Sequence, residues 1–265
     1  MQNGAPSGAP FFLVCLIGRT FFIRRSFFSH RSSLGSMFLQ KRFHPIHIAL
    51  CLNDKACVSA RNMENFCIQL SEQLRKGAEV YIADFKGGVD FPKVWHEKCR
   101  MCFTEADLLI TLNQLVAVLE YRKGRLAETG CPDLDAYNEA TGDNLPRLVF
   151  ACDEVAEVLD KTGADAERKK LLAQIESKLA TIARLGRAFG IHLILATQRP
   201  DATIIPGQIK NNLDFRVCGR AESVLSSIIL DNSSAAEQIP KDARGRFITG
   251  GGTVFQSFLF DDRQL

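Results

Sequence analysis

Two polar segments, each following an apolar run, have the residue types needed to bind and hydrolyse a nucleotide. Asp153-Glu154 follows the run 145–152, and Thr197-Gln198-Arg199 follows the run 191–196. One carboxylate can hold a water-coordinated magnesium ion, and the next can act as base on an attacking water. The Gln198 amide can sense a terminal phosphate. Acidic residues also favour helix N-termini, so Asp153-Glu154 could instead cap the following helix.

The elements that must position these residues form a strand–helix–strand unit. The two apolar runs have the length and composition of buried parallel strands. Between them, residues 164–189 repeat apolar side chains at helical spacing, namely Leu171, Leu172, Ile175, Leu179, Ile182 and Leu185. Such a connection predicts a βαβ unit. Ligands bind beyond the carboxyl ends of parallel strands. The matching polar tips therefore favour the nucleotide site over the helix cap.

The helix and the second strand also carry a family resemblance. Residues 180–190 (ATIARLGRAFG) and 191–200 (IHLILATQRP) strongly resemble the FtsK/SpoIIIE motor domain. The likeness continues through residues 209–213 and 228–231 and covers roughly residues 47–265. It is most similar to the versions found in integrative conjugative elements. The resemblance implies an α/β fold of the RecA-like P-loop NTPase type, with a mainly parallel sheet flanked by helices.

The resemblance also implies a function and a set of roles. The family drives double-stranded DNA through a hexameric ring by hydrolysing ATP with Mg²⁺, in DNA transfer, DNA segregation or conjugation. The site residues implied here are Glu154 and Gln198 for catalysis, Asp153 and Ser59 for the metal, Thr197 for the nucleotide, and Lys210 for DNA. Arg216 and Arg220 are candidates for the arginine given to a neighbouring subunit, because the family's Ser-Arg-Thr appears here as Ser226-Ser227-Ile228.

The phosphate-binding loop departs from the family. The family pattern G-x-x-x-x-G-K-[ST] follows the first core strand, here residues 46–51, and falls on residues 52–59 (LNDKACVS). Leu52 and Cys57 replace glycines whose freedom lets backbone N–H groups surround phosphates, and Val58 replaces the lysine. The loop positions facing the nucleotide would be Asn53, Asp54, Lys55, Val58 and Ser59. Lys55 could substitute for the missing charge, but from a different point on the loop. Two alternatives therefore stay open: a ring subunit deficient in nucleotide binding, or an inactive fragment of such a translocase.

Charge divides the 265 residues into two parts. The first 53 residues hold six of the 33 basic residues and none of the 30 acidic ones, which leaves the remainder slightly acidic. We expect residues 1–44 to be a basic, Phe-rich extension of unknown role, and residues 45–265 to be a cytoplasmic motor domain whose DNA contacts are local. The apolar run 9–18 is about half as long as a membrane span. Membrane attachment would come only from segments upstream, as in full-length relatives.

The remaining patterns predict secondary structure and one weak metal motif. His96, Cys99 and Cys102 make up half of a zinc site, which we interpret as structural because the other half is missing. Cysteines in apolar runs, such as Cys152 and Cys218, indicate buried thiols. Further expected elements are a strand at 79–85, a helix at 108–126, a polar loop at 131–144, a strand at 215–219 and a hairpin at 245–260. The tip of the strand at 79–85, Asp-Phe-Lys-Gly-Gly at residues 84–88, resembles the family's Asp-Pro-Lys segment beside the site, although the two glycines also fit a simple turn.

Overall fold

The chain divides into two units, Met1–His44 and Pro45–Leu265. The structure is a computed structural model, and it describes residues 14–17, 20–23, 48–51, 58–198, 205–257 and 260–265. In the first unit, β1 (Val14–Ile17) pairs antiparallel with β2 (Thr20–Ile23). No helix in the described parts of the chain has both the length and the apolar character that a membrane span requires.

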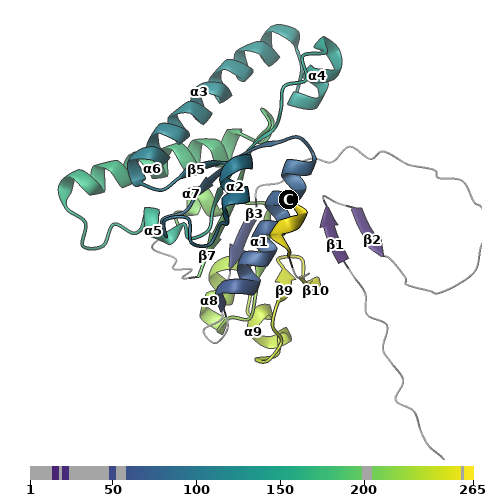
Figure 1. Ribbon diagram of the computed structural model, residues 1–265, viewed down its shortest axis with the longest axis vertical. Helices are drawn as coiled ribbons and strands as arrows, with labels where there is room; N and C mark the ends of the chain where they lie inside the picture. The colour runs from purple at the N-terminus through teal and green to yellow at the C-terminus, as the bar shows by residue number, and fades with distance from the viewer. Residues whose placement is uncertain (1–13, 18–19, 24–47, 52–57, 199–204, 258–259) are drawn as a thin grey trace, which may run out of the picture. The chain divides into compact units, whose positions relative to one another are not determined.

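The described residues of the second unit form an eight-stranded sheet in the order β10-β9-β8-β3-β7-β6-β4-β5 (Figure 1). Neighbouring strands from β8 to β5 run parallel, and β9 and β10 are added antiparallel at one edge. The strand bounds are β3 Ile48–Cys51, β4 Glu79–Ala83, β5 Arg100–Cys102, β6 Leu148–Cys152, β7 Ile191–Thr197, β8 Phe215–Cys218, β9 Arg246–Thr249 and β10 Val254–Gln256. The predicted strand–helix–strand unit and the C-terminal hairpin are confirmed.

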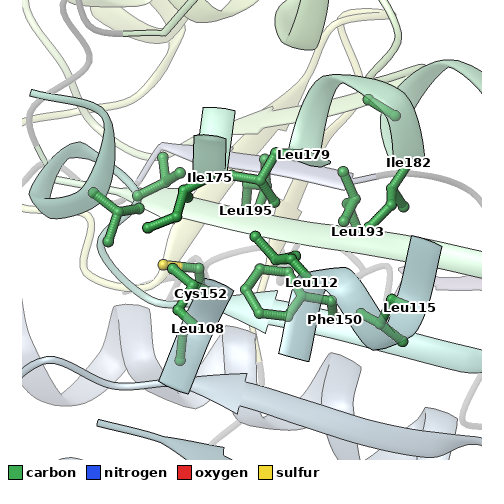
Figure 2. Close-up of a cluster of buried hydrophobic side chains, with 14 of the residues drawn as sticks. Leu108, Leu112, Leu115, Phe150, Cys152, Ile175, Leu179, Ile182, Leu193 and Leu195 are labelled. Carbon is green, nitrogen blue, oxygen red and sulfur yellow. The ribbon is translucent and has the colours of Figure 1, made fainter. Parts of the chain in front are cut away.

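Both faces of the sheet are covered, because successive side chains of a strand point to opposite faces. In β6, Phe150 and Cys152 lie in one hydrophobic core, and Val149 and Ala151 lie in the other. The first core packs against α3 (Glu105–Thr129) and α6 (Ala166–Leu185), the two long helices that lie side by side in Figure 1. Figure 2 shows leucine and isoleucine side chains of these helices meeting Phe150, Leu193 and Leu195.

The second core packs against helices on the other face. It contains Phe66 and Leu70 of α1 (Val58–Arg75) and Trp95 of α2 (Lys93–Lys98), all fully buried. The shorter elements are α5 Ala156–Leu159, α7 Gly207–Lys210, α8 Ser223–Leu230, α9 Ser234–Gln238 and the 3-10 helix Asp262–Gln264. Cys152 and Cys218 are buried in their strands, as their sequence context predicts.

The prediction of a polar loop at residues 131–144 is wrong, because this stretch contains α4 (Leu134–Thr141). The Asp133 carboxylate caps the helix by accepting a hydrogen bond from the Ala136 N–H at 2.8 Å. Leu134 and Tyr137, three positions apart, are buried on one helix face. Gly142 ends the helix in the left-handed conformation, with φ of 77°. Residue types that favour loops also cap helices, and here they do the latter.

Candidate functional site

Strand register brings four strand ends together at one edge of the sheet. Cys51 of β3 lies beside Thr197 of β7, and Cys152 of β6 lies beside Leu195 of β7 and Ala83 of β4. The residues that follow these positions therefore share the carboxyl edge of the parallel sheet, where ligands bind in folds of this kind. Asp153 and Glu154, predicted from sequence as site residues, lie at this edge with Thr197 and Gln198.

The Asp153 carboxylate is buried and paired with a lysine. Lys86, in the turn after β4, donates a hydrogen bond from Nζ to Oδ2 of Asp153 at 2.9 Å. The same ammonium group donates to Oδ2 of Asp90 at 2.6 Å. Asp153 is 2% exposed, whereas the Lys86 side chain is 42% exposed. A buried carboxylate thus contacts a cation that reaches it from the solvent side.

Burial and pairing act in opposite directions on the pKa values of this pair. Burial raises the pKa of Asp153 above its usual value, and the contact with Lys86 opposes this shift. For Lys86, burial lowers the pKa, but the hydrogen bonds to Asp90 and Asp153 outweigh it and raise the pKa overall. Lys86 therefore stays an ammonium group at neutral pH.

A second aspartate orders the turn that carries Lys86. Asp84 is fully buried, and its Oδ1 accepts a hydrogen bond from the Lys86 N–H while its Oδ2 accepts one from the Gly88 N–H, each at 2.8 Å. Gly87 and Gly88 have φ values of 74° and 85°, a conformation that residues with a Cβ rarely adopt. The Asp84–Gly88 segment is thus an ordered turn beside Asp153.

Glu154 links the ends of β6 and β7. Its Oε1 accepts a hydrogen bond from the Thr197 hydroxyl at 2.6 Å, and its Oε2 accepts one from the Gln198 N–H at 2.9 Å. The Ala156 N–H also lies 3.4 Å from Oε1. This last contact is long, and the N-cap residue of α5 is Val155, which makes no side-chain cap. The contacts to β7 are shorter than the helix-capping contact, so positioning at the strand ends is the main arrangement of Glu154.

The five loop residues predicted for the site lie outside the described residues or at the start of α1. Asn53, Asp54 and Lys55 lie outside the described residues, and Val58 and Ser59 are the first two residues of α1. The start of α1 follows the end of β3, so it belongs to the same edge of the sheet. The roles assigned to these five residues stay predictions.

The three basic residues predicted to act on a neighbour or on DNA make contacts within the chain. Lys210 donates to Oδ1 of Asp231 and Arg216 to Oδ2 of Asp231, both at 2.6 Å. Arg220 donates to the backbone carbonyls of Ala236 and Ile239 near the end of α9. Lys210 and Arg216 line a small, mostly apolar pocket that also includes Thr197, so they lie close to the site edge. Their proposed roles stay predictions.

The sequence resemblance places Asp84 and Lys86 beside the site but gives them no individual roles, and it does not include Asp90. The Asp-Phe-Lys-Gly-Gly string was available as a signal, because charged residues directly after a strand of a parallel sheet lie at the ligand edge. The pairing of Lys86 with Asp153 joins positions 67 apart in sequence, and only the strand order brings them together.

The residues at this edge fit a magnesium ion held jointly with phosphates. Magnesium in nucleotide sites is usually bound by one or two carboxylates together with phosphate oxygens. Asp153 supplies such a carboxylate, and no described residue donates a hydrogen bond to its Oδ1. Among the described residues, no group of three or more His, Cys, Asp or Glu is placed to hold a metal by itself. Lys86 already contacts Oδ2, so a metal at Asp153 must compete with an ammonium group.

The residues of the half zinc motif, His96, Cys99 and Cys102, make packing contacts within the fold. Cys99, directly before β5, and Cys102, at the end of β5, are both buried, and burial raises the pKa of the Cys99 thiol to about 12. The His96 ring lies against Phe103 and places Nε2 3.1 Å from the Phe91 carbonyl oxygen. A thiol with a raised pKa is a poor metal ligand, because the thiolate is the binding form. These contacts agree with the structural interpretation.

Comparison with known proteins gives a consistent set of relatives. No protein-family model matches the chain. The chain is 35% identical over 129 residues to the DNA translocase FtsK of Helicobacter pylori, covering 47% of this chain and 14% of that protein. It is 33% identical over 162 residues to the DNA translocase SftA of Bacillus subtilis, covering 58% of this chain and 16% of that protein. The chain thus spans less than a fifth of the length of either relative.

Solved structures agree with the sequence matches. The pCW3 conjugation coupling protein TcpA, in a monomer form with ATPγS, is 34% identical, with a TM-score of 0.77 over 83% of this chain and 62% of that one. The cytoplasmic domain of the type VII secretion ATPase EccC from Thermomonospora curvata is 20% identical, with a TM-score of 0.59 over 80% of this chain and 25% of that one, which shows the fold alone. With the resemblance of residues 180–200, these matches show that the chain is similar to FtsK/SpoIIIE DNA translocases and has a RecA-like P-loop NTPase fold.

Proposed function

We propose that this chain is the motor domain of an ATP-dependent double-stranded DNA translocase that acts in DNA transfer, DNA segregation or the mobilisation of a conjugative element. The observation that carries the proposal is the arrangement of Asp153 and Glu154. One is a buried carboxylate at the ligand edge of the sheet, and the other is fixed to β7 by Thr197 and Gln198. The names of the translocase and coupling-protein relatives support the choice of DNA as substrate.

The residues at the strand ends have distinct tasks in hydrolysis. A bound Mg²⁺ would neutralise charge on the phosphates and polarise them. Asp153, with Ser59, is the candidate to hold it. Glu154 accepts a proton from the attacking water, and its bonds to Thr197 and Gln198 fix the direction in which its carboxylate points. The Gln198 side chain contacts the terminal phosphate, and its backbone N–H orients Glu154.

Assembly into a ring and contact with DNA are part of the same proposal. A hexamer would place Arg216 or Arg220 near the nucleotide of the next subunit, and Lys210 near the DNA in the pore. Lys210 and Arg216 share one acidic partner, Asp231, which is 57% exposed. Exposed ion pairs are worth little, so both side chains can exchange this partner for a phosphate at small cost.

A second function has its own supporting observation. Val58 stands where the family has lysine, and Asp153 already holds an internal cation, Lys86. A ring subunit that has the fold but binds no nucleotide would have these two features. This subunit would stabilise the ring and contact DNA without turning over ATP.

A magnesium-dependent nucleotide titration separates the two functions. We expect saturable but weak ATP binding by residues 45–265, and ATP hydrolysis that increases with duplex DNA. A Glu154→Gln variant should still bind ATP and should not hydrolyse it, because an amide cannot act as the base. No binding at millimolar ATP with Mg²⁺, by a protein that is folded and still joins rings, would favour the non-hydrolysing subunit.

A further inference from the structure

Lys86 is the described cation that contacts the predicted metal-binding carboxylate. Its Nζ lies 2.9 Å from Oδ2 of Asp153 and 2.6 Å from Oδ2 of Asp90. Its backbone is held by Asp84 through the turn at Gly87 and Gly88. An ordered turn thus positions the ammonium group at the carboxyl edge of the sheet, where the nucleotide is expected to bind.

The Lys86 side chain is anchored at its base and partly exposed to solvent. The Asp84 carboxylate fixes the Lys86 N–H, whereas the side chain is 42% exposed. Of its two acidic partners, Asp153 is buried and Asp90 is partly exposed. A lysine carries four rotatable side-chain bonds and a compact charge. Nζ can therefore leave Asp153 without any change in the backbone of the turn.

The loop that follows β3 lacks a lysine at the position where the family has one, and its Lys55 stands at a different point of the loop. Val58 occupies the lysine position, and a lysine there normally neutralises the terminal phosphates. Two other cations at this edge, Lys210 and Arg216, are paired with Asp231. Lys86 points at Asp153, which is the side chain expected to share a metal with those phosphates. It is thus the described cation best placed to replace the missing one.

We propose that Lys86 supplies the phosphate-binding charge that is missing at position 58, by exchanging Asp153 for the terminal phosphate when a nucleoside triphosphate binds. This inference rests on the proposed nucleotide site. Before binding, Lys86 neutralises Asp153, so the buried carboxylate is never left without a cation, which would be strongly destabilising. When Lys86 turns to the phosphate, it frees Oδ2 of Asp153 for magnesium. Asp90 remains as a second partner that limits how far Nζ moves.

The exchange makes two predictions of opposite sign for one substitution. Lys86→Met keeps most of the side-chain stem and removes the charge. Triphosphate binding should weaken by about tenfold or more, which is the effect of losing one charge-assisted contact. Magnesium alone should bind the variant more tightly than the wild type, because no ammonium group competes for Asp153. Diphosphate binding should change less than triphosphate binding, since the terminal phosphate is the partner of Lys86.

The experiment uses the full chain, a fluorescent ATP analogue, the corresponding ADP analogue, and magnesium alone followed by thermal unfolding. Lys86→Arg keeps the charge and should keep most triphosphate binding. Lys123→Met is the matched control, because Lys123 is an exposed lysine of α3 that pairs with Glu120 at 3.2 Å. It should leave all three measurements unchanged. Asp90→Asn removes one partner of Lys86 and should tighten triphosphate binding, which provides a test even if Lys86→Met does not fold.

The outcomes separate this inference from the proposed function. If the wild type binds ATP and Lys86→Met binds it equally well, the exchange is wrong and the nucleotide site stands. The exchange is also wrong if Lys86→Met weakens ADP binding and ATP binding equally, or if magnesium no longer raises the thermal stability of this variant. Lys86 would then act only on the stability of the turn. Unchanged or weaker binding by Asp90→Asn counts against it. If the wild type binds neither nucleotide, the proposed function fails first and the exchange fails with it.

Discussion

The Thr197 hydroxyl donates a hydrogen bond of 2.6 Å to Oε1 of Glu154, and both side chains are buried. Thr197 ends β7, and Glu154 follows the end of the neighbouring parallel strand β6. The Gln198 N–H completes the attachment by donating to Oε2. Hydrogen bonds to a carboxylate are short and stronger than those between neutral groups. The direction of the candidate base is therefore set by β7, while the position of the neighbouring Asp153 charge is set by the turn after β4.

Removing the Thr197 hydroxyl should affect both stability and hydrolysis. Thr197→Val keeps the shape of the side chain but leaves a buried carboxylate oxygen with one donor fewer. We expect the free energy of unfolding to fall by about 1–3 kcal/mol, measured by urea denaturation. ATP hydrolysis should fall while ATP binding stays nearly the same, because Glu154 acts on the water. Thr197→Ser keeps the hydroxyl and is the control. Loss of binding and hydrolysis together would show that Thr197 contacts the nucleotide itself.

The strands at the site can be predicted from the sequence, but the order of the strands in the sheet cannot. The residues of β6 and β7 are apolar apart from His192 and Thr197, because both faces of each strand are buried, and this pattern predicts a central parallel strand. Which polar tip meets which is decided by strand order. Lys86 meets Asp153 because β4 lies beside β6, and no local periodicity in the sequence records that neighbour.

Helix α4 was not predicted from the sequence, for a different reason. Its buried residues are Leu134 and Tyr137, which are too few to give a periodic signal among polar neighbours. Its ends are set by Asp133 and Gly142, residues that also form loops. The Tyr137 hydroxyl donates to Asp143 and accepts from Arg125 of α3, so tertiary contacts fix this helix. Such contacts are not visible in a single sequence.

The Asp231 ion pairs should make stability depend on pH in the acid range. Hydrogen bonds from Lys210 and then Arg216 lower the pKa of Asp231 below the usual 3.8. A carboxylate with a lowered folded-state pKa stabilises the fold above its unfolded pKa and loses that contribution as pH falls through the folded value. We expect Asp231→Asn to reduce the dependence of unfolding free energy on pH below about 4.

The asparagine variant is suited to this test, because Asp231 has a φ of 62° and asparagine tolerates that conformation. The effect should be small, since Asp231 is 57% exposed and exposed pairs contribute little. If wild type and variant give parallel curves of stability against pH, the two basic residues are not held by Asp231 in solution. Lys210 and Arg216 would then be available to a partner without competition from Asp231.

DNA binding should require assembly. Residues 54–265 carry 27 basic and 30 acidic residues, so a monomer has no overall attraction for DNA. We expect residues 45–265 to bind duplex DNA weakly as a monomer, and the ring to bind with a steep loss of affinity as salt rises. The comparison must be made without residues 1–44, because that basic segment could bind DNA regardless of sequence. Equal binding by the truncated monomer and the oligomer would contradict a pore.

The last prediction asks whether restoring the family loop restores the motor. Leu52→Gly, Cys57→Gly and Val58→Lys together rebuild the pattern in which glycines free the backbone and lysine neutralises phosphate. We expect the triple variant to bind ATP far more tightly than the wild type and to hydrolyse it, measured by titration and phosphate release. Each single change should do little, because the backbone and the charge are both needed.

The repaired loop also tests the proposed role of Lys86. With a lysine at position 58, the terminal phosphate has a second cation, so Lys86→Met should weaken ATP binding less in the triple variant than in the wild type. The non-additivity of the two changes measures their coupling in a double-mutant cycle. Adding Glu154→Gln to the triple variant should keep binding and stop turnover, because an amide cannot act as the base. If the triple variant folds and assembles but binds no nucleotide, the site has changed beyond its loop, and the non-hydrolysing ring subunit becomes the better description.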